Sequence, residues 1–105
     1  MEKTRIVVTG MGVITPLGNE VGAFWDNLVA GKSGIRKVQA FDTEAYPCKV
    51  GGEVADFNPG DYMDPKDAKR NDRYTQFGVA AARKALEDAR LEAKNLEDPV
   101  RFGCI

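Results

Sequence analysis

Residues 5–9 near the N-terminus, Arg-Ile-Val-Val-Thr, are mostly β-branched and form a continuous rather than an alternating pattern. Such a run, without polar alternation, predicts a short strand buried on both faces of a sheet. Residues 10–19 then contain three glycines and Pro16. This stretch predicts a loop, because glycine frees the backbone and proline does not fit a helix interior.

A helical period follows that loop. Four apolar side chains recur at spacings of three and four residues: Val21, Phe24, Trp25 and Leu28. The spacing predicts a helix over about residues 20–30 with one apolar, core-facing stripe. Asn19 is the expected N-cap and Gly31 the expected C-cap of this helix.

The stretch 35–63 has no sustained period, and turn residues interrupt its short apolar pieces. It predicts an irregular excursion with one short strand near residues 48–54. Asp64 and Pro65 then suit the cap and the first position of another helix.

A longer helix is predicted over about residues 72–89, because apolar and alanine side chains recur there at helical spacing. Its expected buried face consists of Tyr74, Phe77, Ala81, Ala85 and Leu86. Residues 100–105 again have a strand-type pattern. Two parallel strands and two helices leave a sheet with an unpaired edge, so the pattern predicts the start of a larger α/β fold.

Composition narrows the class of protein. A compact chain of 105 residues is expected to bury about two-thirds of its unfolded surface. The formal net charge is −1, so no overall basic excess favours nucleic acid or an anionic membrane. No apolar run reaches the length of a signal-peptide core or of a membrane span. These features predict a soluble, cytoplasmic protein.

The chain has no histidine and only two cysteines, Cys48 and Cys104. The commonest general base and metal ligand is therefore missing, and the cysteines lack paired spacing. We expect no metal site and no disulfide framework. Cys104 lies within the predicted C-terminal strand, where we expect a buried, structural thiol.

The glycine loop permits two interpretations. Gly10 and Gly12 after a strand suggest a dinucleotide-binding loop, but Thr15 stands at the third glycine position and Pro16 delays the helix. The favoured interpretation is structural: the glycines allow a buried loop to pack closely against neighbouring backbone.

Several short motifs, in order, resemble one family. They are residues 6–12, 15–18, 30–35, 41–42, 56–58, 72–78, 85–89 and 101–103. Together they are similar to the N-terminal part of the β-ketoacyl-acyl-carrier-protein synthases, most of all the elongating, type II bacterial enzymes. The resemblance covers essentially the whole chain.

The resemblance implies a thiolase-like fold, built of two α/β halves, each with a mixed sheet layered with helices. Residues 1–105 would be the N-terminal segment of the first half. It also implies an acyltransferase of fatty-acid synthesis that elongates acyl chains by decarboxylative Claisen condensation and works as a homodimer without a cofactor. The family's catalytic cysteine and two histidines have no counterpart here, so we expect no catalytic residue and no activity from these 105 residues alone.

One surface feature points to a partner. On a helix through residues 66–73, four cations fall within an arc of about 100°: Lys66, Lys69, Arg70 and Arg73. The plainer interpretation is a solvated helix face with intrahelical ion pairs. The resemblance implies that Lys66, Lys69 and Arg70 receive the acidic acyl-carrier protein, whereas Arg73 departs from the family pattern.

Two other functions remain open at this point. One is a non-catalytic partner of the chain-length-factor type, or a ketosynthase of a polyketide pathway. The other is an autonomous small α/β binding domain. The long irregular stretch 35–63, which needs something to pack on, argues against the autonomous domain.

Overall fold

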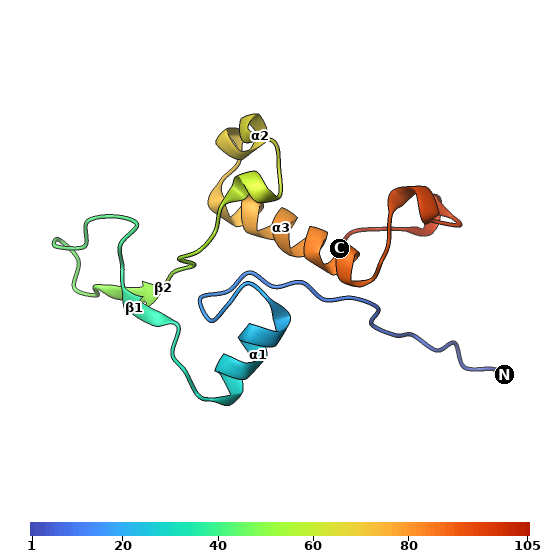
Figure 1. The fold of residues 1–105 in the computed structure, drawn as a ribbon, viewed down its shortest axis with the longest axis horizontal. Helices are drawn as coiled ribbons and strands as arrows, with labels where there is room; N and C mark the ends of the chain where they lie inside the picture. The colour runs from blue at the N-terminus through green and yellow to red at the C-terminus, as the bar shows by residue number, and fades with distance from the viewer.

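The computed structural model describes all residues from Met1 to Ile105. Helices and short turns dominate, and the only sheet has two strands (Figure 1). The α-helices and strands are α1 (Val21–Val29), β1 (Ile35–Lys37), β2 (Val50–Gly52), α2 (Pro65–Arg70) and α3 (Arg73–Asp88). The 3₁₀ turns are η1 (Pro59–Asp61), η2 (Ala93–Asn95) and η3 (Pro99–Arg101).

The N-terminal glycine segment lies along α3 near the centre of the molecule (Figure 1). A Cβ atom on Gly10 would overlap the carbonyl oxygen of Ala85, and one on Gly12 would overlap that of Ala81. The Met11 N–H donates to Asp88 Oδ2 at 2.9 Å. The structural interpretation of the glycines is therefore confirmed: their backbone meets the small-residue face of α3.

The loop after this segment closes on itself. Thr15 Oγ1 donates to the Gly18 carbonyl at 2.7 Å and accepts from the Leu17 and Gly18 N–H groups. Gly18 has a φ of +150°, which favours glycine. Because these amides already have partners within the turn, the loop does not present them to a phosphate.

The helix predicted over 20–30 is confirmed as α1, and Gly31 follows it with a φ of +68°. The N-cap prediction was wrong. Glu20 occupies that position without a side-chain cap, while Asn19 donates from Nδ2 to the Asp56 carbonyl at 2.8 Å. Asn19 thus ties two loops together instead of capping α1.

The short strand predicted near 48–54 is confirmed as β2. It pairs antiparallel with β1, a strand that the pattern did not predict, with Ile35 opposite Gly52. The helix predicted after Asp64 is confirmed as α2, and the helix predicted over 72–89 is confirmed as α3.

The predicted strands at 5–9 and 100–105 were wrong for this chain. Residues 5–9 belong to no strand, and the second region contains η3 followed by non-repetitive backbone. A strand forms only with a hydrogen-bonded neighbour, and the 105 residues place none beside either segment.

Very little of the chain is buried. Only Ala80 and Thr43 are buried, and the accessible surface is 8904 Å², whereas a compact protein of this mass exposes about 5,800 Å². The radius of gyration is 17.6 Å, against about 13 Å for a compact chain. The chain buries about half of its unfolded surface, so the expectation of two-thirds was wrong.

The predicted core faces are correspondingly incomplete. Trp25 on α1 is 60% exposed and Tyr74 on α3 is 75% exposed, whereas Phe77, Ala81 and Ala85 are half-buried. The face of α3 that meets the glycine segment is covered, and Phe77 packs against Phe57, whereas Tyr74 and Leu86, both predicted to be buried, are exposed.

Candidate functional site

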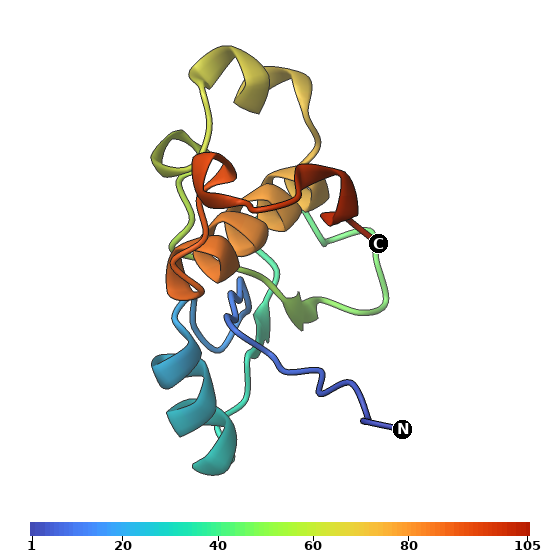
Figure 2. The same ribbon diagram turned by 90° about the vertical axis from the view of Figure 1, so that its right-hand side faces the viewer.

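Helix α2 stands away from the rest of the molecule (Figures 1 and 2). Its start follows from local sequence: Pro65 occupies the first turn, and Asp64 Oδ1 accepts from the Lys66 N–H at 2.8 Å. Its end follows from Asn71, whose extended backbone (φ −113°, ψ 141°) stops the helix. The result is a six-residue helix with a free outer face.

The three predicted docking residues all lie on α2, and their side chains are exposed. Helical spacing places Lys66, Lys69 and Arg70 within an arc of about 100°. None of them forms an ion pair, so the intrahelical pairs of the plainer interpretation are absent. Lys69 and Arg70 lie in the last turn, where positive charge is favourable beside the helix dipole.

Arg73 does not continue this strip, and the prediction that it shares a helix face with the other three was wrong. It begins α3, and its Nη2 donates to the Val54 carbonyl at 2.8 Å. Its guanidinium lies 4.9 Å from the Phe77 ring centroid and 5.7 Å from that of Phe57. Arg73 therefore joins elements within the molecule.

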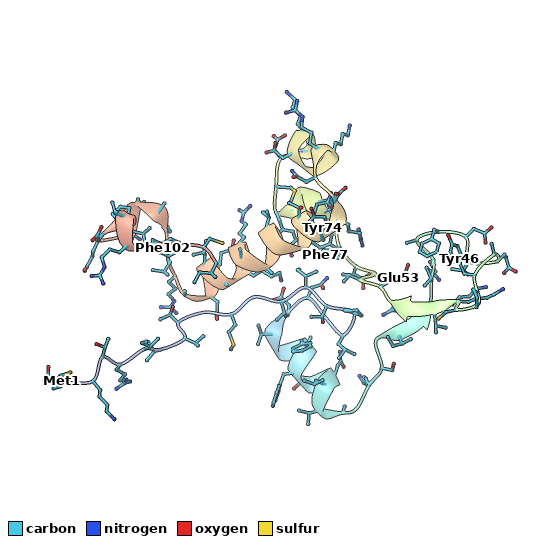
Figure 3. The ribbon with its side chains drawn as sticks, turned by 180° about the vertical axis from the view of Figure 1, so that it is seen from behind. Met1, Tyr46, Glu53, Tyr74, Phe77 and Phe102 are labelled. Atoms are coloured by element: carbon cyan, nitrogen blue, oxygen red, sulfur yellow. The ribbon has the colours of Figure 1, made fainter.

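An aromatic cluster fixes the approach to α2. Phe57 stacks on Tyr62 with ring centroids 5.7 Å apart, and it is nearly perpendicular to Phe77 on α3, with ring centroids 4.9 Å apart. Arg83 Nη1 donates to the Tyr62 carbonyl at 3.0 Å. Tyr74, predicted to be buried with Phe77, is instead largely exposed at the start of α3 (Figure 3).

Lys84 is a residue that the sequence pattern missed. Its Nζ donates to the Asn19 carbonyl at 2.6 Å, pairs with Glu20 Oε1 and lies 5.8 Å from the Tyr62 ring. Partial burial disfavours its charged form, but the hydrogen bond from Lys84 to Glu20, together with the electrostatic effects of Tyr62 and Glu20, raises the pKa of Lys84 above its ordinary value. One sequence signal could have identified Lys84: it lies three residues after Ala81, on a face of α3 that otherwise consists of small residues.

Glu53 closes the base of the β1–β2 hairpin (Figure 3). Its two carboxylate oxygens accept the backbone N–H groups of Gln39 and Ala40, each at 2.9 Å. These hydrogen bonds hold the pKa of the Glu53 carboxyl below its ordinary value.

The rest of the surface includes two hollows and two free cysteines. Two hollows, of about 680 Å³ and 830 Å³, lie beside Lys84 and beside Glu53, and neither is lined by a cysteine. Cys48 and Cys104 are both free and exposed, so the prediction that Cys104 is buried in a strand was wrong. No group of three or more acidic, cysteine or histidine side chains gathers as metal ligands would. None of the helices has both the length and the apolar composition of a membrane span.

Comparison with known proteins agrees with the resemblance inferred from the motifs. The family "Beta-ketoacyl synthase, N-terminal domain" matches residues 3–105. The chain is 42% identical over 99 residues to 3-oxoacyl-[acyl-carrier-protein] synthase 2 of Coxiella burnetii, covering 94% of this chain and 24% of that protein. It is 44% identical over 96 residues to the synthase 2 of a Synechocystis species, covering 91% of this chain and 23% of that protein.

A solved structure described as the ishigamide ketosynthase/chain length factor superposes with a TM-score of 0.75 and 40% sequence identity. The match covers 86% of this chain and 22% of that one. The chain thus spans about a quarter of the length of the curated relatives it matches.

Proposed function

The chain belongs to the beta-ketoacyl synthase family through its N-terminal domain, and from that premise we propose that it serves a condensing enzyme of fatty-acid synthesis. The reaction is decarboxylative Claisen condensation, in which malonyl-carrier protein supplies the carbanion that attacks an acyl group held on the enzyme. The complete protein would act as a homodimeric acyltransferase. Residues 1–105 contribute no catalytic residue, and the cysteine nucleophile and both histidines would come from elsewhere in the protein.

The family has a thiolase-like fold, and we assign residues 1–105 to the N-terminal segment of its first half. The support is the exposed surface. The backbone superposes on a ketosynthase-type structure about four times its length, yet Ile6 is 91% exposed and Val100 is 93% exposed. Burying such side chains is worth about 1.5–3 kcal/mol each. Residues 5–9 and 100–105 would become strands of a mixed sheet once neighbouring strands pair with them.

The role of this segment is to receive the acidic acyl-carrier protein on α2. The observation that carries this proposal is the set of three exposed cations, Lys66, Lys69 and Arg70, which have no acidic partner within the chain. Unpaired charges on a protruding helix attract and orient an oppositely charged partner. The net charge of −1 makes this a local effect.

Charge reversal tests the docking role. In the full-length enzyme, Lys69→Glu with Arg70→Glu should raise the KM for carrier-protein substrates about tenfold or more at low salt. Small thioester analogues, which do not contact the helix, should be processed as before. The matched control is Lys32→Glu with Lys37→Glu. It changes the net charge by the same amount, at two exposed lysines that lie outside α2. Equal losses with both substrates would mean that the α2 charges serve folding instead.

A second candidate is a non-catalytic subunit of the chain-length-factor type, or a ketosynthase of a polyketide pathway. The observation in its favour is the 40% identity to the ishigamide ketosynthase/chain length factor. The 105 residues are compatible with both, because the deciding nucleophile is not among them. Condensation by the full-length protein that is lost on alkylation of its cysteine would support the proposal of a condensing enzyme. Activity only in the presence of a second, related subunit supports the alternative.

A further inference from the structure

Helix α2 has little of its own to hold it in place. With six residues it is far below the length at which an isolated helix is stable in water. Only Ala68 on this helix is half-buried, and the other side chains are exposed. Its orientation must therefore come from bonds to its ends.

The N-terminal end is held through the chain before it. The cluster of Phe57, Tyr62 and Phe77 joins this approach to α3, and Asp64 caps the first turn. These contacts fix where α2 begins, but they do not reach its last turn.

The C-terminal end is held by one side chain of α3. Gln76 Nε2 donates to the Ala68 carbonyl at 2.8 Å and to the Asn71 carbonyl at 3.2 Å. Ala68 belongs to the last turn of α2, whose carbonyls lack helical partners, and Asn71 is the residue that ends it. Because both partners are acceptors, the amide group must present its two N–H donors to them.

We propose that Gln76 is a positioning residue for carrier-protein docking. It locks the last turn of α2 onto the first turn of α3 and so sets the direction in which Lys66, Lys69 and Arg70 face the partner. The inference rests on the proposed docking function of α2. Charge supplies the attraction, and Gln76 supplies the orientation that turns an encounter into a productive complex.

The test is Gln76→Met in the full-length enzyme, which preserves the size of the side chain and removes both donors. We expect the KM for the carrier-protein substrate to rise about fivefold, with kcat at saturation and the kinetics of small thioester analogues unchanged. Direct titration with the carrier protein should show the same weakening. The matched control is Gln39→Met, because Gln39 is exposed and its side chain makes no hydrogen bond.

Each outcome separates the inference from its premise. If Lys69→Glu with Arg70→Glu raises the carrier KM and Gln76→Met does not, Gln76 has no positioning role and the docking function stands. If neither change affects the carrier KM, the docking function itself is wrong. If Gln76→Met lowers kcat equally for carrier and small substrates, the residue serves general stability, and the positioning role is again rejected.

Discussion

Two contacts with α3 work by opposite means. One joins the glycine segment to α3, and the other joins the C-terminal end of α2 to α3. At the first, Gly10 and Gly12 bring backbone against the backbone of Ala81 and Ala85, with no room for a methyl group. At the second, α2 is held by Gln76 and Asn71 through hydrogen bonds to its last carbonyls, and its charged side chains remain free. The comparison indicates that the charged side chains of α2 can vary without disturbing packing, because its backbone is anchored at its ends.

The largest effect is expected where no side chain fits. Gly12→Ala should destabilise the full-length protein by about 2–3 kcal/mol, because the new Cβ overlaps the Ala81 carbonyl and lies 2.7 Å from the Ala85 nitrogen. Denaturant-induced unfolding measures this change.

Gly78→Ala, on the helix α3 that Gly12 contacts, is the control, since nothing lies within 4 Å of a Cβ at that position. It should stabilise α3 by about 0.5–1 kcal/mol through helix propensity. Equal destabilisation by both substitutions would mean that close backbone packing is not what distinguishes the glycine segment.

An intermediate effect is expected at Lys84, which links α3 to the loop before α1. Lys84→Met removes its bonds to the Asn19 carbonyl and to Glu20, with an expected loss of about 1–2 kcal/mol. Lys94→Met, at an exposed ion pair with Glu92, is the control and should cost less than about 0.5 kcal/mol.

The pH dependence gives an independent measurement of the same link. The pKa of Lys84 is raised in the folded state, so its stabilising contribution is complete below its ordinary pKa of 10.5. It is lost as the pH rises through the higher folded-state pKa. The stability difference between the parent and Lys84→Met should therefore shrink only above pH 10.5; a difference that already declines at neutral pH would contradict this ion pair.

The smallest effect is expected at Glu53, which holds a loop through two amides. Its pKa is lowered in the folded state, so its contribution is present above its ordinary pKa of 4.5 and is lost as the pH falls through the lower folded-state pKa. Glu53→Gln should speed hydrogen exchange at the Gln39 and Ala40 amides near neutral pH, after correction for intrinsic rates. Unchanged protection at both amides would show that the carboxylate does not hold this loop.

Local signals predicted the helices well, because caps and breakers act over a few residues. Asp64 with Pro65 and the period of 72–89 gave α2 and α3, and Gly31 gave the end of α1. The misassigned residues depend on distant contacts. Residues 5–9 have the composition of a strand, but strand formation needs a neighbour that composition does not supply.

The candidate site was likewise predictable in part. The spacing of Lys66, Lys69 and Arg70 placed them on one helix face, whereas Arg73 was misplaced because Asn71 ends the helix before it. Gln76 gave no signal, since its partners are backbone carbonyls of another element. The family resemblance, carried by many short motifs, was confirmed by the match over residues 3–105.

Calorimetry on residues 1–105 alone tests the central claim that this chain is one segment of a larger thiolase-like enzyme. Because only two residues are buried, the isolated chain should show no cooperative heat absorption on unfolding. A cooperative transition with an enthalpy of about 60–80 kcal/mol, as expected for an autonomous domain of this size, would contradict the account. That result would favour a small, self-sufficient binding domain.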